Sequence, residues 1–230
     1  MIKALIRNAY IFFVNFDPSR YRYRNLDKSK LRWPFRMMRH PLSALYEIKY
    51  EGRGSLALAN ACLFLFFLLQ VIRYSGRGFL FNTNLPEDFS LPFQLAVSCL
   101  PICLWCISLW ASSVLFDGEG SFRELYITSA YALLPLMLFS VLEMLLSNVL
   151  LLEEAAFLAL FTAIGTGWTI LLYILSTLVI EQFTLKRTVF CMLTSLFFLL
   201  LIVFIGLLLM NFLQQMVLFV QSVVKEIVFR

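Results

Sequence analysis

Glu143 is the residue of this chain whose type and position could support chemistry inside an apolar environment. It lies within a long apolar run, and Ser147 follows one helical turn later on the same face. An ionised carboxylate near the centre of a membrane helix costs about 2.5–3.5 kcal/mol, so such a group is protonated, paired or in contact with water. Glu143 is therefore either a proton or solute site or a polar contact between helices, with Arg73 as the candidate partner for its charge.

A second polar pattern follows in the next apolar run. Hydroxyl side chains recur there at helical spacing, namely at Thr162, Thr166, Thr169, Tyr173 and Thr177. The spacing places them along one face of a helix. Hydroxyl and small residues commonly join membrane helices, at about 0.6 kcal/mol per hydrogen bond, and we favour this packing role. The alternative is a polar path for a solute, formed by this stripe together with Glu143 and Ser147.

No pattern in the sequence predicts an enzyme. Cys103 and Cys106 form a C-x-x-C pair, but residues three apart on a helix have Cβ atoms about 5–6 Å apart, too far for a disulfide. The single histidine, His40, has no second metal ligand at a suitable spacing. A nucleophile elbow and a phosphate-binding loop are also missing from the sequence. We therefore expect no catalytic residue, metal or other cofactor.

The elements that position these residues must be membrane helices. Hydrophobic residues make up 61% of the chain and charged residues 14%, against about 25% charged residues in an average soluble domain. Crossing the hydrocarbon core takes about 20 helical residues, and lipid forces the backbone to satisfy its own hydrogen bonds. The predicted fold is therefore all-α, a polytopic bundle of five transmembrane helices near 55–73, 92–116, 126–150, 155–181 and 188–210.

Basic residues set the predicted orientation. Twelve of the 19 Lys and Arg lie in the first 54 residues, and Arg123, Lys186 and Arg187 fall on the same side. Basic loops stay in the cytoplasm, so the N-terminus is predicted inside and the C-terminus outside. We divide the chain into a basic amphipathic cytoplasmic segment (1–54), a five-helix membrane domain (55–210) and an outer amphipathic helix (211–230). That last helix lies either on lipid or on a partner.

The N-terminal segment is predicted to follow the membrane surface. Residues 1–16 form an amphipathic interfacial helix, and a second helix runs from Pro41 to Tyr50. In the second helix Leu42, Leu45, Tyr46 and Tyr50 face the bilayer, whereas Glu47 and Lys49 face water. Anionic inner-leaflet lipid, rather than nucleic acid, is the expected partner of the basic residues. These candidate contacts are Arg20, Arg22, Arg24, Lys28, Lys30, Arg32, Arg36 and Arg39.

A polar elbow, Asp117-Gly-Glu-Gly-Ser-Phe-Arg-Glu-Leu-Tyr-Ile-Thr-Ser-Ala-Tyr-Ala-Leu-Leu-Pro135, joins the second and third apolar runs. Ser121 and Glu124 have the spacing of a capping box, and Pro135 is predicted to kink the third helix. The elbow is either a well-formed turn or a cytoplasmic docking site. The candidate docking residues are Asp117, Gly118, Gly120, Ser121, Phe122, Arg123, Glu124, Tyr126, Tyr131 and Pro135.

The elbow and the segment His40-Pro-Leu-Ser-Ala-Leu-Tyr-Glu-Ile-Lys-Tyr-Glu-Gly-Arg-Gly-Ser55 resemble the YIP family, membrane proteins first described as partners of Rab-type GTPases. The chain is most similar to a bacterial member, over most of its length from about Arg39. The resemblance implies a multi-pass protein of the bacterial cytoplasmic membrane. It does not carry over Rab binding, because Asp117-Gly118 lacks the Gly-Pro step typical of eukaryotic members.

Three functions are compatible with these patterns. The one we favour is a non-catalytic accessory or scaffold subunit that packs against another integral membrane protein. The resemblance further implies association with a solute transporter of the ABC type. A small transporter or channel would instead use Glu143 and the polar stripe of the fourth helix. A membrane-shaping or trafficking factor would use the amphipathic helices at the two ends of the chain.

Overall fold

The computed structural model describes residues 32–82 and 89–228, and all regular structure within them is helical. The predicted helix at 1–16 and the basic residues from Arg20 to Lys30 lie outside the described residues. The elements are α2 (Trp33–Arg39), α3 (Pro41–Tyr50), α4 (Leu56–Gly76), α5 (Leu91–Leu115), α6 (Phe122–Ala132), α7 (Leu134–Leu146), the 3-10 turn η3 (Leu152–Glu154), α8 (Ala155–Ile180) and α9 (Leu185–Val228).

Five helical stretches are long and apolar enough to cross a membrane, which confirms the prediction of an all-helical fold with five candidate spans. They are α4, α5, α6 with α7, η3 with α8, and α9. The third stretch is interrupted at Leu133, whose N–H reaches back to the carbonyls of Ala130 and Tyr131. Pro135 at the start of α7 has no N–H to continue the ladder, so the predicted break in this helix is present.

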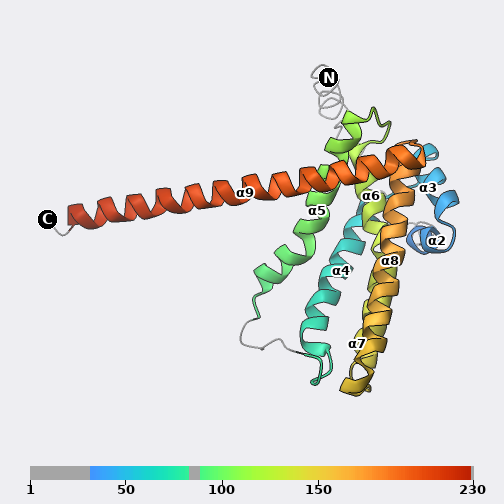
Figure 1. Cartoon of the computed structure of the whole chain (residues 1–230), viewed down its shortest axis with the longest axis horizontal. Coiled ribbons are helices and arrows are strands. Elements are labelled where there is room, and N and C mark those ends of the chain that lie inside the picture. Colours follow the sequence, from blue (N-terminus) through green and yellow to red (C-terminus); the bar gives the residue numbers. More distant parts are fainter. Residues whose placement is uncertain (1–31, 83–88, 229–230) are drawn as a thin grey trace.

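The main hydrophobic core lies where helices α2 to α8 meet. Figure 1 shows α4, α5, α7 and α8 running roughly side by side, with α2 and α3 against the flank near one end. The prediction that Leu45 faces the bilayer and Lys49 faces water was wrong. Leu45 is completely buried and the Lys49 side chain is only 9% exposed, because α6 and α8 cover this face of α3. Tyr46 and Tyr50, on the other face, are exposed as expected.

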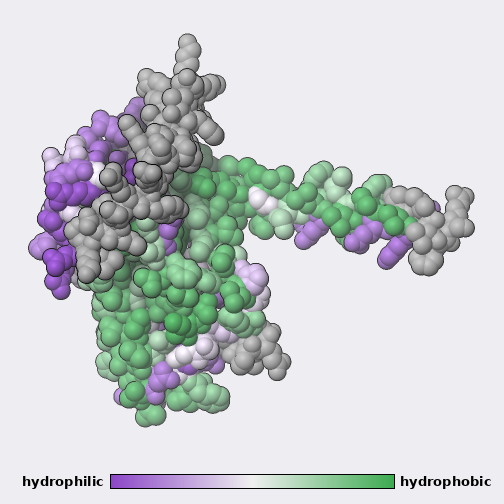
Figure 2. All heavy atoms as spheres, turned by 180° about the vertical axis from the view of Figure 1, so that it is seen from behind, coloured by the Kyte–Doolittle hydropathy of each residue, from purple (hydrophilic) through white to green (hydrophobic). Residues whose placement is uncertain are grey.

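Segments far apart in the sequence gather at the two ends of the bundle. At one end, which we call the elbow end, α3 meets the loop 116–121 and the turn 181–184. At the opposite end the loop 77–82 meets the end of α7. A five-span threading requires this grouping, although the side of the membrane that each end faces stays a prediction. Figure 2 shows hydrophilic residues concentrated over the α2–α3 region, beside a largely apolar surface.

The last helix, α9, leaves the bundle. Its first turns pack on α5, where the Ser112 hydroxyl donates to the Cys191 carbonyl over 2.8 Å. From Val203 onward every side chain that the structure describes is exposed, and Figure 1 shows the helix projecting roughly at right angles to its neighbours. The predicted fifth span and the predicted C-terminal surface helix thus form one continuous helix of 44 residues. At 1.5 Å per residue it is about 66 Å long.

Candidate functional site

Glu143 is completely buried and pairs with two arginines, Arg73 near the end of the first span and Arg77 just after it. Its Oε2 lies 3.0 Å from Nη2 of Arg73, and its Oε1 lies 2.8 Å from Nη2 of Arg77. Two guanidinium charges and one carboxylate charge leave the cluster with a formal charge of +1. Arg73 was expected from the sequence, whereas Arg77 was missed. The available signal was its place in the loop directly after α4, four residues beyond Arg73.

Backbone contacts beside this cluster tie α4 to α7. The Gly78 N–H donates to the Ser147 hydroxyl over 2.9 Å, and the Asn148 amide donates to the Gly76 carbonyl over 3.1 Å. A Cβ atom at Gly78 would lie only 1.9 Å from the Ser147 carbonyl oxygen, so the close approach requires glycine. Ser147 therefore has a bonding role within the bundle, one turn from Glu143.

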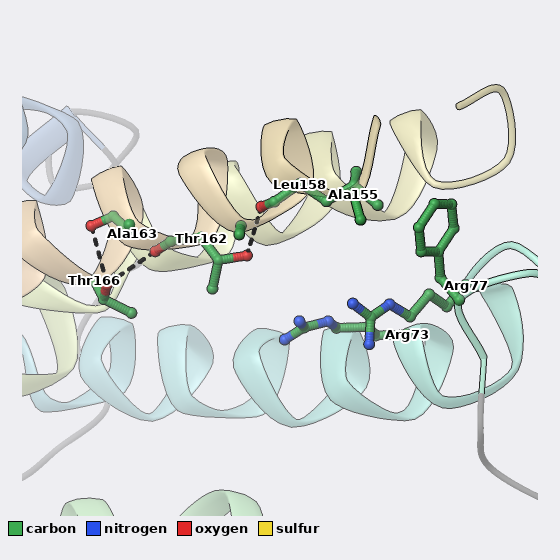
Figure 3. A pocket seen from close by; sticks show the side chains of 9 residues that line it. Arg73, Arg77, Ala155, Leu158, Thr162, Ala163 and Thr166 are labelled. Atoms are coloured by element: carbon green, nitrogen blue, oxygen red, sulfur yellow. Dashed lines mark hydrogen bonds between the residues drawn. The ribbon is translucent and has the colours of Figure 1, made fainter. Parts of the chain in front are cut away.

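A cavity of about 460 Å³ lies next to the two arginines, between α4 and α8. Figure 3 shows the guanidinium groups of Arg73 and Arg77 lying between these helices, with Thr162 and Thr166 on the opposite wall. The remaining lining residues are apolar, namely Phe81, Ala155, Leu158, Ala159 and Ala163. The cavity thus combines two cationic groups with walls suited to hydrocarbon.

Three hydroxyls of the threonine stripe bond within α8, and the packing role that we favoured stays a prediction. Thr162, Thr166 and Thr177 donate to carbonyls of their own helix, over 2.9–3.1 Å, because a helical threonine hydroxyl can reach the carbonyl three or four residues back. The predicted intramembrane site also divides. Thr162 and Thr166 line the cavity, whereas Thr169 is buried further along α8 and the ring of Tyr173 packs on Trp105 of α5 at 5.7 Å.

A second polar cluster, at the elbow end, was missed from the sequence. Glu181 follows the last residue of α8 and is 1% exposed, and its Oε2 accepts the Gly120 N–H over 2.9 Å. A Cβ atom at Gly118 would lie 2.0 Å from Oε2, and one at Gly120 would lie 2.6 Å from Oε1. Glycine at both positions lets the backbone of the elbow lie directly against this carboxylate. The glycine pattern Asp117-Gly-Glu-Gly was the available signal, but it does not say what the glycines approach.

Lys49 completes this cluster from α3. Its ammonium group donates to the Ile180 carbonyl at the end of α8, where a cation complements the negative end of the helix dipole. It also lies 4.0 Å from a carboxylate oxygen of Glu119 in the elbow. We call Lys49, Gly118, Gly120, Ile180 and Glu181 the elbow latch, because they hold α3, the elbow and α8 together.

Burial raises the pKa of Glu181, and the Gly120 N–H and the charge of Lys49 act in the opposite direction. A carboxyl whose pKa is higher in the folded than in the unfolded protein favours folding most below its unfolded pKa. That contribution is lost as the pH rises through the folded pKa. The elbow latch should therefore be tighter in mild acid than at neutral pH.

The capping box predicted at the start of the third span is present. The Ser121 hydroxyl accepts the Glu124 N–H over 3.3 Å, and the Glu124 carboxylate accepts the Ser121 N–H over 3.0 Å. These reciprocal bonds fix the point at which α6 begins. Asp117, Ser121 and Arg123 are exposed beside it and stay candidates for docking.

Other predicted docking residues of the elbow have a role inside the bundle. The Tyr126 hydroxyl donates to the Asn60 side chain over 2.6 Å, and the Tyr131 hydroxyl donates to the Ser55 carbonyl over 3.2 Å. Tyr131 is 1% exposed and Pro135 is also buried. Both therefore lie within the bundle, where a docking partner cannot reach them, and the two tyrosines hold α6 against α4.

The described basic residues on α2 differ in their surroundings. Arg36 lies 2.8 Å from a carboxylate oxygen of Glu47, and its guanidinium stacks over Trp33 at 5.1 Å. Arg32 and Arg39 are exposed. The charge of Arg36 is thus partly balanced within the protein, and lipid contact by these residues stays a prediction.

The structure defines a multi-pass, α-helical membrane protein with a charged cluster at each end of its bundle. All five cysteines are free thiols, and among residues 32–82 and 89–228 no group of three or more His, Cys, Asp or Glu could hold a metal ion. A family model described as the Yip1 domain matches residues 35–216, so the chain belongs to the Yip1 family. No curated protein and no solved structure matches the chain.

Family membership has two consequences. It confirms the resemblance to the YIP family, and it identifies the protein as a multi-pass membrane protein in a family whose members are not enzymes. The matched range contains both charged clusters, the cavity and the first 32 residues of α9, from 185 to 216. These features therefore belong to the family domain rather than to an added segment.

Proposed function

We propose that this protein is a non-catalytic scaffold or accessory subunit of an integral membrane complex. In this proposal the bundle α4–α8 anchors the subunit, and α9 binds the partner. The observation that carries it is the exposure of α9, in which every described side chain from Val203 onward is uncovered. A helix that contributes this little to its own core contributes its surface to something else.

The chemistry of α9 favours the helices of another membrane protein as the partner. Amide side chains interrupt its apolar surface at Asn211, Gln214 and Gln215. The Asn211 amide nitrogen donates to the Leu207 carbonyl of the same helix, which leaves the Asn211 amide oxygen as an acceptor for another chain. Amides in an apolar environment hydrogen-bond between helices, at about 0.6–2 kcal/mol each. Figure 2 shows hydrophilic residues in a row along the outer half of α9.

The partner we propose is a solute transporter of the ABC type in a bacterial cytoplasmic membrane. The resemblance to bacterial members of the family supports this choice. The exposed elbow residues Asp117, Ser121 and Arg123 provide a second contact surface at the other side of the bundle from the cavity. In the predicted orientation this surface is cytoplasmic, where it would face the soluble parts of such a complex.

Copurification from the native membrane tests the proposal. The protein is extracted in mild detergent, and stoichiometric partners are identified for the full chain and for a chain that ends after Met210. Because every described side chain from Asn211 to Glu226 is exposed, the shortened protein should keep the thermal stability of the full chain and lose the partner. A point variant replaces Asn211 by leucine, and a matched control replaces the half-buried Gln94 of α5 by leucine. Retention of the partner by the shortened chain, or purification of the full chain alone, would contradict the proposal.

Transport by the protein itself is the second candidate, and the cavity beside Glu143 is the observation in its favour. Against it, the described residues that line the cavity come from α4, the following loop and α8, and none comes from the elbow end. Glu143→Gln separates the two functions. Lost solute flux with an intact complex would favour transport, whereas lost assembly would favour a structural role. Membrane shaping, the third function, predicts curvature-dependent remodelling of vesicles by the purified protein.

A further inference from the structure

One of the arginines that line the cavity between α4 and α8 has a hydrogen-bond donor that the protein does not use. The ion pairs of Arg73 and Arg77 with Glu143 are formed by Nη2 of each arginine, and a guanidinium carries five N–H groups. Nε of Arg77 is buried and has no hydrogen-bond partner. A buried donor without an acceptor is costly, so this position favours a ligand that brings an oxygen acceptor.

The charge of the site selects an anion. Glu143 neutralises one of the two guanidinium groups, so the cluster keeps a formal charge of +1. The nine residues that line the cavity include no carboxylate. A planar guanidinium fork fits carboxylate and phosphate groups, to which it can donate two parallel hydrogen bonds.

The walls and the size of the cavity favour a lipid over a free ion. Inorganic phosphate would fill only a small part of about 460 Å³. Beyond the arginines the wall consists of small and apolar residues of α8, and Ala155, Ala159 and Ala163 are themselves exposed on its surface. These alanines leave a shallow path along the helix in which a hydrocarbon chain can lie. Figure 3 shows the arginines toward one end of this path and Thr166 toward the other.

We propose that this cavity binds one anionic phospholipid. Its phosphate accepts hydrogen bonds from Arg73 and Arg77, and one of its acyl chains lies along Ala159 and Ala163. The lipid would join α4 to α8 at the end of the bundle opposite the elbow. In the predicted orientation it belongs to the outer leaflet, so it is distinct from the inner-leaflet lipid expected at the basic N-terminal segment.

Lipid retention by the purified full-length protein tests the site. Delipidated protein is mixed with detergent micelles that contain phosphatidylglycerol or phosphatidylcholine, and bound lipid is counted by native mass spectrometry. We expect one phosphatidylglycerol per protein, bound more tightly than phosphatidylcholine. The lining residues include no carboxylate that could pair with the choline cation of phosphatidylcholine. Arg77→Gln should weaken binding about tenfold, through the loss of a charge-assisted hydrogen bond. Arg187→Gln, an equivalent change at the elbow end, should leave it unchanged.

A second variant separates the binding of lipid from the stability of the charged cluster. Ala159→Phe fills the cavity without altering any of the ion-paired side chains, so it should abolish retention while Arg73 and Arg77 still hold Glu143. Unchanged retention of phosphatidylglycerol in both Arg77→Gln and Ala159→Phe would overturn the proposal. Inorganic phosphate provides the other arm. If millimolar inorganic phosphate displaces no bound phosphatidylglycerol, the assignment of a lipid ligand is supported. If inorganic phosphate binds in place of the lipid, that assignment is overturned.

Discussion

The elbow latch makes a quantitative prediction for Gly120→Ala. The added methyl group would lie 2.6 Å from Oε1 of Glu181, 2.8 Å from its Cδ and 2.9 Å from Cγ2 of Ile180. The carboxylate must therefore move, and the hydrogen bond that Gly120 donates to Oε2 is lost. A hydrogen bond to a charged group contributes about 1.5–3 kcal/mol, and overpacking costs about 1–3 kcal/mol. We expect a total loss of about 3 kcal/mol in the free energy of unfolding.

A double-mutant cycle with Glu181→Ala assigns this loss to the carboxylate. In the Glu181→Ala background two of the three close contacts disappear and only the Ile180 contact remains, so Gly120→Ala should then cost about 1 kcal/mol. The coupling energy between the two sites is therefore about 2 kcal/mol, within the range measured for residues in contact.

Unfolding of the purified protein in detergent micelles, followed by circular dichroism, measures these differences. For a chain of this length about 3 kcal/mol corresponds to a shift of about 6–12 °C in Tm. Gly167→Ala is the matched control, because a methyl group there meets nothing within 4 Å and alanine is a better helix former than glycine. Additive effects of Gly120→Ala and Glu181→Ala, within about 0.5 kcal/mol, would refute the reasoning.

Two further predictions concern the charged clusters. Because burial raises the pKa of Glu181, lowering the pH from 7 toward its ordinary pKa of 4.5 should raise the Tm of the wild-type protein relative to Glu181→Gln, and parallel pH profiles of the two proteins would contradict this. Glu143→Gln should lower the free energy of unfolding by about 3 kcal/mol, because two guanidinium groups then face each other without a carboxylate between them. The exposed Glu153→Gln should change it by less than about 0.5 kcal/mol, and an equally small effect of Glu143→Gln would mean that the observed pairing contributes little.

The sequence predicted those features that depend on neighbouring residues. The apolar runs identified the membrane helices because lipid leaves the backbone no other structure. The capping box at Ser121 and the break near Pro135 followed from local hydrogen bonding and from the missing N–H of proline. These rules depend on residues close together in the chain, so the amino-acid sequence alone is enough to apply them.

Contacts between distant segments could not be read in the same way. Lys49 and Ile180 are 131 residues apart, and Gly120 and Glu181 are 61 apart. The period of α3 showed that one of its faces must be covered, but it could not distinguish lipid from α6 and α8. For that reason the sequence predicted that Leu45 contacts the bilayer and that Lys49 contacts water, although Leu45 is buried and the Lys49 side chain is largely covered. The hydrogen bonds of the threonine stripe could not be assigned for a related reason, because a hydroxyl on a helix can bond its own backbone as readily as a neighbouring helix.

The two charged clusters also explain why α9 stands apart from the bundle. Lipid is as apolar as leucine, so burial of hydrocarbon does not drive membrane helices together, and polar and close-packed contacts decide which helices associate. The helices α4 and α7 are tied through Glu143, and α3, the elbow and α8 are tied through Glu181. Within the described residues, the polar contacts of α9 with the bundle lie near its start, where Arg187 is 4.0 Å from Asp117 and Cys191 accepts a bond from Ser112. The direction of α9 relative to the bundle is therefore set by the molecule that covers it. A partner that offers hydrogen-bond acceptors and donors to Asn211, Gln214 and Gln215 would fix that direction.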